Sequence, residues 1–289
     1  MVPAMKLFRF GPPGREKPGV IEETGNWLDV SRFGEDYGEA FFGNDGPKRL
    51  ADWLVKERNE CPVVSETERV GPAVCRPSKI VCVGLNYRGH AAETNARVPS
   101  EPVLFMKATS SQAGPFDDIV LPRGSTKTDW EIELAFVVGR VARYVSRDRA
   151  LDHVAGYMCH NDLSEREFQL ERSGQWVKGK SADSFSPMGP FLATPDEVDP
   201  FDVKLWLDVN GKRMQSSSTS DFIADIPAII ACITQYMTLL PGDVVSTGTP
   251  AGVGMGQNPP VFLKPGDVVE FGAEGLGSGR QKVVVSPHG

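Results

Sequence analysis

Two glutamates and one aspartate are the residues of this sequence with the clearest capacity for chemistry. Glu131 and Glu133 stand two apart in residues 129–138, DWEIELAFVV, and Asp162 follows an apolar-bounded segment, GYMCHN. Side chains two apart in a strand share one face, so we expect the two glutamates to point the same way. Three converging carboxylates form the ligand set that a hard divalent cation such as Mg²⁺ or Mn²⁺ prefers.

The same acidic pattern has a second explanation without a metal. Unpaired charges are costly to bury and like charges repel, so these acids need a cation, a shared proton or solvent. An edge strand with a wet acidic face meets that need, because alternation is common on half-buried strands. Spacing alone leaves both explanations open.

A histidine and a glutamate further upstream form a candidate general base. Residues 79–84, KIVCVG, are a short apolar run that predicts a buried strand leading into a polar turn. His90 and Glu93, three apart at a helix start, can lie on one face and form a hydrogen bond. A histidine with a carboxylate partner is a competent base near neutral pH, although a solvated helix start is the commoner setting for such a pair.

Residues 174–181, GQWVKGKS, match the phosphate-binding pattern G-x-x-x-x-G-K-[ST]. That loop works only between a buried strand and a helix whose N-terminal amides hold the phosphates. Polar residues precede it here, and Pro187 and Pro190 interrupt the segment after it, so the sequence argues against ATP or GTP binding. Lys180 remains of interest as a positive charge for an anionic substrate, if it projects towards the acids.

Composition excludes several classes of protein. The 289 residues are 40% hydrophobic and 24% charged, which is ordinary for a globular chain of one large domain or one large and one small. A net charge of -7 without a Lys/Arg block argues against nucleic acid as a partner. The sequence shows neither an apolar run of membrane-spanning length nor a targeting pattern at its start, so we expect no membrane association and a cytoplasmic location.

The chain is expected to divide near residue 74. Residues 1–74 mix short strands with turns and a helix at residues 47–57, which predicts a small N-terminal domain. Residues 75–289 are expected to form the main domain. The predicted fold class is mostly β with some α, an α+β arrangement.

Three segments of the main domain have distinctive local patterns. Residues 203–209 alternate as a strand, and Asn210-Gly211 after them is a strong hairpin signal. Residues 226–240 carry isoleucines at helical spacing, and the charged residues 164–172 are also helix-prone.

Five motifs together resemble those of the fumarylacetoacetate hydrolase family, over essentially the whole chain. Their common order makes the set far more specific than any one of them. The motifs are GLNYRGHAAE at residues 84–93, DWEIEL at 129–134, NDLSER at 161–166, GKS at 179–181 with PMGP at 187–190, and STGTP at 246–250.

The resemblance implies a roll-like, mostly β catalytic domain, a small N-terminal domain and a homodimer. It also implies a role for each matching residue. Glu131, Glu133 and Asp162 would bind Mg²⁺ or Mn²⁺, His90 and Glu93 would form the base on a segment that orders over substrate, and Lys180 would stabilise negative charge; Gln169 and Thr249 would touch substrate, and Arg166 would lie beside the metal.

The implied activity is metal-dependent cleavage of a C–C bond in a small 2,4-diketo (acylpyruvate-type) acid, giving pyruvate and a short acid. The alternative is an isomerase or decarboxylase that uses the same enolate chemistry. Residues 11–19, 168–172 and 275–277 resemble the subgroup of 2,4-diketo-3-deoxy sugar-acid hydrolases, whose members are often labelled ureidoglycolate lyases or 2-hydroxyhepta-2,4-diene-1,7-dioate isomerases. The serine-rich loop expected at residues 215–220 departs from that subgroup, and a substrate contact there would weaken the sugar-acid assignment.

Overall fold

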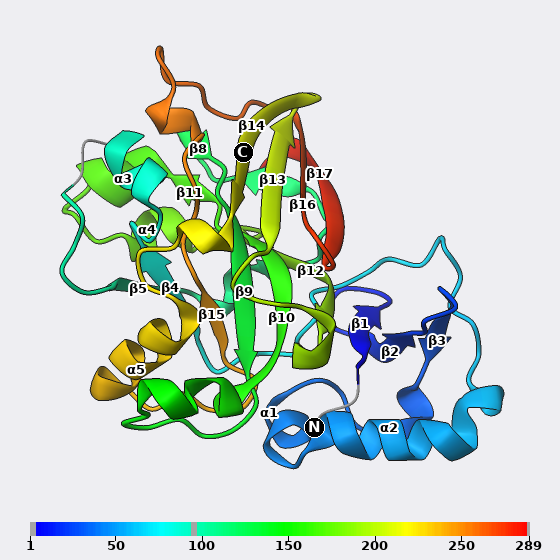
Figure 1. Cartoon of the computed structure of the whole chain (residues 1–289). Helices are drawn as coiled ribbons and strands as arrows, with labels where there is room; N and C mark the ends of the chain where they lie inside the picture. Colours follow the sequence, from blue (N-terminus) through cyan, green and yellow to red (C-terminus); the bar gives the residue numbers. More distant parts are fainter. Residues whose placement is uncertain (1–3, 94–96, 288–289) are drawn as a thin grey trace.

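A long, ten-stranded mixed sheet forms the centre of the protein in the computed structural model, which describes residues 4–93 and 97–287 (Figure 1). Nine strands follow one another across it in the order β3-β2-β1-β12-β10-β9-β15-β4-β5, and β6 pairs with β12. The strands are β1 (Lys6–Phe10), β2 (Lys17–Ile21), β3 (Trp27–Asp29), β4 (Ile80–Gly84), β5 (Val103–Lys107), β6 (Gln112–Ala113), β9 (Ile132–Val138), β10 (Val154–Asn161), β12 (Ser186–Ala193) and β15 (Val244–Ser246).

A second sheet of five strands has the order β14-β13-β16-β17-β7, and a small ladder pairs β11 with β8. These strands are β7 (Ile119–Leu121), β8 (Thr128–Asp129), β11 (Ser164–Glu165), β13 (Lys204–Val209), β14 (Lys212–Ser218), β16 (Val268–Ala273) and β17 (Gly277–Val285). The mostly β, α+β fold class predicted from the sequence is confirmed.

Helices are few and lie around the sheets (Figure 1). The α-helices are α1 (Glu39–Gly43), α2 (Gly46–Glu57), α3 (Arg88–Glu93), α4 (Val177–Lys180) and α5 (Ile226–Tyr236). Shorter turns are η1 (Ser31–Phe33), η2 (Arg58–Glu60), η3 (Thr109–Ser111), η4 (Arg147–His153), η5 (Glu167–Glu171), η6 (Pro195–Glu197), η7 (Thr219–Asp221) and η8 (Gly254–Gly256). Within the described residues, no helix has the length and apolar character needed to cross a membrane.

Two local predictions are confirmed with their physical causes. Asn210 and Gly211 both adopt positive φ, 52° and 76°, as the tight hairpin between β13 and β14 requires. Helix α5 begins where the Asp225 side chain accepts a hydrogen bond from the backbone N–H of Ala228 at 2.9 Å. It ends at Tyr236, earlier than the predicted residue 240.

Three local predictions are wrong. Residues 129–138 are not one strand, because the chain breaks between β8 and β9. Residues 164–172 form β11 and the π-helix η5 rather than one helix, because Ser164 pairs with Asp129 in the β8–β11 ladder. Residues 215–220 are not a free loop, since they continue β14 up to Ser218 before the turn η7.

The N-terminal segment is joined to the central sheet. Strand β1 pairs with β12, with Leu7 opposite Leu192. Buried residues of this segment, such as Leu7 and Phe41, share one apolar cluster with Val137 of β9 and Met188 of β12. The predicted division at residue 74 stays a prediction; the structure shows a sheet and a core that continue across it.

Candidate active site

The three acids singled out in the sequence converge. Carboxylate oxygens of Glu131, Glu133 and Asp162 all lie within 4.8 Å of one another, and all three residues are buried. Antiparallel pairing of β9 with β10 sets Glu133 opposite His160, one residue pair from the strand end. The backbone N–H of Asp162 then donates to the carbonyl of Glu131 at 2.8 Å, and the side chain of Asn161 accepts from the backbone N–H of Glu131 at 3.0 Å.

Two buried lysines neutralise part of this acidic cluster. Lys180 Nζ, at the end of α4, lies 2.7 Å from Glu131 Oε2 and 2.7 Å from Asp162 Oδ2. Lys107 Nζ, at the end of β5, forms an ion pair with the other oxygen of Asp162 and donates to the carbonyl of Leu163. Sequence reasoning missed Lys107; its only signal was a lysine that closes an apolar strand.

Arg166 clamps the other side of the cluster. Its guanidinium lies 2.7 Å from Glu131 Oε1 and 2.8 Å from Asp129 Oδ2. Asp129 also accepts hydrogen bonds from the backbone N–H groups of Gly254 and Met255, at 2.6 Å and 3.0 Å. One buried aspartate thereby ties the arginine to the glycine-rich turn η8, which fixes a wall of the site.

Glu133 is held by neutral donors instead. Its Oε2 accepts from the Ser246 hydroxyl at 2.5 Å and from the backbone N–H of Gly248 at 2.9 Å. Ser246 Oγ is in turn 2.6 Å from His160 Nδ1. Burial lowers the pKa of His160 to about 3, so this imidazole is neutral at physiological pH.

The pKa values of the acids diverge accordingly. Burial raises the pKa of Glu133 well above its ordinary value, and the charges of Asp162 and Glu131 add to that shift. Burial also acts to raise the pKa of Asp162, but Lys107 and Lys180 outweigh it and the pKa lies below its ordinary value. Glu133 is therefore the carboxylate whose charge is least compensated by the protein.

The cluster fits a hard divalent cation. Four buried carboxylates face three buried cations among the described residues, so the fourth carboxylate must be balanced by a proton or by an added cation: the acids are Asp129, Glu131, Glu133 and Asp162, and the cations are Lys107, Arg166 and Lys180. The donor atoms that converge are all oxygens, the ligands that Mg²⁺, Mn²⁺ and Ca²⁺ prefer.

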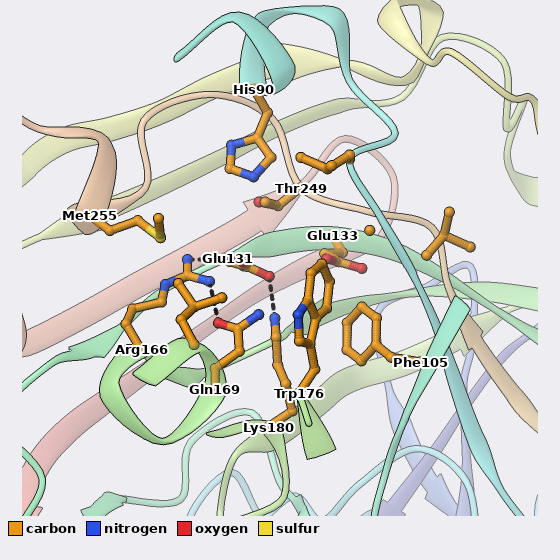
Figure 2. Close-up of a pocket in the computed structure, with 14 residues that line it drawn as sticks. His90, Phe105, Glu131, Glu133, Arg166, Gln169, Trp176, Lys180, Thr249 and Met255 are labelled. Atoms are coloured by element: carbon orange, nitrogen blue, oxygen red, sulfur yellow. Dashed lines mark hydrogen bonds and ion pairs between the residues drawn. The ribbon is translucent and has the colours of Figure 1, made fainter. Parts of the chain in front are cut away.

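A cavity of about 230 Å³ opens onto this cluster (Figure 2). Seven of the nine residues predicted from the sequence line it: His90, Glu131, Glu133, Arg166, Gln169, Lys180 and Thr249. The other two contact them, Asp162 through Lys180 and Glu93 through His90. The structure thus brings all nine together, while the chemical role of each stays a prediction.

His90 projects from α3 into the cavity, on the side opposite Lys180 (Figure 2). Its Nδ1 lies 3.3 Å from Glu93 Oε2. Glu93 also accepts the backbone N–H of Gly252 at 3.0 Å, which anchors α3 to the loop before η8. A carboxylate that orients an imidazole over a cavity is the arrangement of a general base.

Gln215 is a buried residue that sequence reasoning passed over as part of a serine-rich loop. Its amide nitrogen donates to Thr249 Oγ1 at 2.8 Å and to the carbonyl of Pro250 at 2.9 Å. Its amide oxygen accepts the backbone N–H of Ile132 at 2.9 Å. Gln215 therefore holds Thr249 at the start of β9, and no local pattern in the sequence announces this long-range contact.

The phosphate-loop pattern at residues 174–181 lacks the structure that nucleotide binding requires. The π-helix η5 precedes it where a buried strand would be needed, and the helix within it, α4, has only four residues. Its last lysine, Lys180, turns towards Glu131 and Asp162.

The chain belongs to the fumarylacetoacetate hydrolase family. Residues 79–284 match the family described as fumarylacetoacetate (FAA) hydrolase C-terminal. A Burkholderia multivorans protein, provisionally named a hydrolase, is 49% identical over 279 residues, which cover 96% of this chain and 98% of the relative.

Solved structures with the same fold include both hydrolases and isomerases. A fumarylacetoacetate hydrolase from Exiguobacterium antarcticum is 36% identical with a TM-score of 0.82, over 98% of this chain and 100% of that one. A 2-hydroxyhepta-2,4-diene-1,7-dioate isomerase from Mycobacterium marinum is 33% identical with a TM-score of 0.75, over 98% and 99%. A maleylpyruvate hydrolase from Sphingobium sp. SYK-6, in complex with manganese(II) and pyruvate, is 27% identical with a TM-score of 0.81, over 98% and 100%.

Replacing Ser246 with alanine should weaken divalent-cation binding by about 10- to 100-fold, the usual cost of losing a group that orients a metal ligand. The variant removes the hydroxyl that fixes Glu133 Oε2. Calorimetric titration of the metal-free protein with MnCl₂ measures the change.

The matched control is Ser186→Ala, which removes a buried serine hydroxyl bonded to Ser111 rather than to the acids. It should bind Mn²⁺ as the unmodified protein does. Equal affinity in the Ser246→Ala variant would show that this hydroxyl does not support the site.

Proposed function

We propose that the protein is a divalent-metal-dependent hydrolase that cleaves the C–C bond of a 2,4-diketo (acylpyruvate-type) acid to give pyruvate and a short acid. The observation that carries the proposal is that a candidate cation site and a candidate general base lie at the same cavity. Glu131, Glu133 and Asp162 form an all-oxygen cation site, and His90 with Glu93 forms a candidate base beside it.

Mg²⁺ or Mn²⁺ is the cofactor we propose for the three acids. The manganese and pyruvate in the Sphingobium relative support this choice of cation and of product. When bound, such a cation supplies a Lewis acid that polarises the keto oxygens of the substrate. Arg166, which already holds Glu131, and Lys180, which holds both Glu131 and Asp162, would keep these carboxylates in place.

The protein side chains then account for hydrolysis. His90, oriented by Glu93, takes a proton from a water molecule, whose oxygen attacks the 4-oxo carbon. The bond between C3 and C4 breaks, and its electron pair moves into the enolate of pyruvate. Lys180 lines the cavity, and its ammonium group would stabilise the negative charge that develops on the enolate oxygen of pyruvate. His90 returns its proton to C3, and the acyl half leaves as a carboxylic acid.

Isomerisation or decarboxylation would use the same enolate without a base that activates water. The Mycobacterium marinum relative is named an isomerase, so the family includes proteins named for both reactions. The His90–Glu93 pair at the cavity favours hydrolysis for this chain. The family resemblance also supports a homodimer as the assembly, which we include in the proposal.

Removal of metal should abolish activity. Protein stripped with EDTA should release no pyruvate from acetylpyruvate in a lactate dehydrogenase assay, and MgCl₂ or MnCl₂ should restore the release, because the acids alone offer no Lewis acid. Unchanged activity in protein shown by elemental analysis to be metal-free would contradict the proposed cofactor. Conversion of the substrate without pyruvate release would favour the isomerase.

Replacing His90 with alanine should reduce kcat by about 100- to 10,000-fold, the range lost with a general base. Affinity for Mn²⁺ should stay the same, because the converging oxygen ligands come from the three acids and not from His90. The half-buried His153, which contacts the carbonyl of Arg140, provides the matched control when replaced in the same way and should leave kcat unaltered. Turnover of His90→Ala at the normal rate would exclude this residue as the base.

A further inference from the structure

The residues that line the cavity are of two kinds. One set is charged and polar, and carries the acids and their cations. The other set is apolar and is called the apolar wall below: Val83, Leu85, Phe105, Leu170, Trp176 and Met255. A substrate that fills the cavity therefore contacts both sets.

The apolar wall is firmly positioned. Trp176 lies against the backbone of Gly84, where an added Cβ would come within 2.8 Å of the indole ring, so the ring occupies space that only glycine leaves free. Phe105 meets Trp176 edge-on, with ring centroids 5.2 Å apart. Lys180 Nζ lies 4.9 Å from the centroid of Phe105, so the polar and apolar sets meet at these two residues. Figure 2 shows the three side chains together.

The cations of the cavity are already engaged. Lys180 bridges Glu131 and Asp162, and Arg166 bridges Glu131 and Asp129. Among the described residues that line the cavity, the only other basic side chain is His90, which bonds to Glu93. A second carboxylate on the tail of a substrate would thus lose water at the apolar wall without gaining a cation, which is costly.

Charge balance around the acids also favours a substrate with a single carboxylate. With all four acids ionised, the cluster carries one more negative than positive charge, so a bound divalent cation would leave one positive charge. That charge matches a single carboxylate at the polar head of the substrate. At about 230 Å³, the cavity is also below the roughly 300–1,000 Å³ usual for ligand sites, which favours a compact molecule.

We propose that the acyl end of the substrate is an uncharged, apolar group, a short alkyl or aryl tail seated against Trp176, Phe105 and Leu170. This inference rests on the proposed function and narrows it. It sets the chain apart from hydrolases of dicarboxylic substrates and from the sugar-acid subgroup, because hydroxyl groups at this wall would also lose their hydrogen bonds to water.

The test uses three acylpyruvates of similar size, whose tails are propyl, carboxyethyl and dihydroxypropyl. The propyl compound should have a kcat/KM at least about tenfold above each of the others, measured by pyruvate release. Preference for the carboxylate or the hydroxylated tail would overturn the inference and leave the proposed function standing. No pyruvate from any of them would overturn the proposed function instead.

The affinities of the three acylpyruvates can be compared in a variant that does not turn them over. Calorimetry on the His90→Ala variant, loaded with Mn²⁺, should give a Kd at least about tenfold lower for the propyl compound than for the other two. Equal or reversed affinities would overturn the inference, whatever the activity of the unmodified enzyme.

A cation introduced at the apolar wall should weaken the preference for the propyl tail. Leu170 is 46% exposed, so Leu170→Arg can be accommodated at the rim of the cavity. The variant should lower the propyl-to-carboxyethyl ratio of kcat/KM by about tenfold or more, by pairing with the second carboxylate. Leu151→Arg, at a leucine that is 39% exposed on η4, is the matched control and should keep the ratio. An unchanged ratio in Leu170→Arg would contradict the placement of the tail.

Discussion

Compensation of buried negative charge is the constraint on which this structure depends. Glu131, Glu133 and Asp162 are removed from water beside one another, and such a group is stable only when cations or donors surround it. Lys107 and Lys180 supply two of those cations. The four buried acids outnumber the three buried basic side chains by one. The site therefore has room in its charge balance for an additional cation.

This constraint also explains the irregular parts of the fold. Arg166 stands between the short strand β11 and the π-helix η5, and Lys180 ends the four-residue helix α4. The break between β8 and β9 lets Asp129 hold Arg166 while Glu133 stays in the sheet. These irregular segments therefore hold Asp129, Arg166 and Lys180 against the acids.

The three acids of the site could be predicted from the sequence, but several residues that surround them could not. The two-residue spacing of Glu131 and Glu133 left a metal site and a wet strand edge both open, and the family resemblance implied that Asp162 joins them, as it does in the structure. Lys107 was missed because its partner Asp162 lies 55 positions away, and local periodicity carries no such information. Trp176 stood out only as part of a phosphate-loop pattern, although its packing on Gly84 shapes the cavity. The hairpin at Asn210-Gly211 was predicted correctly because it depends only on the positive φ angles of these two adjacent residues.

The location of a bound cation tests the account most directly. Anomalous diffraction from crystals grown with MnCl₂ should show one strong peak about 2 Å from carboxylate oxygens of Glu131, Glu133 and Asp162, next to the apolar wall that contains Trp176. A manganese site elsewhere on the protein, or none at saturating concentration while the three acids keep only their protein partners, would contradict the account.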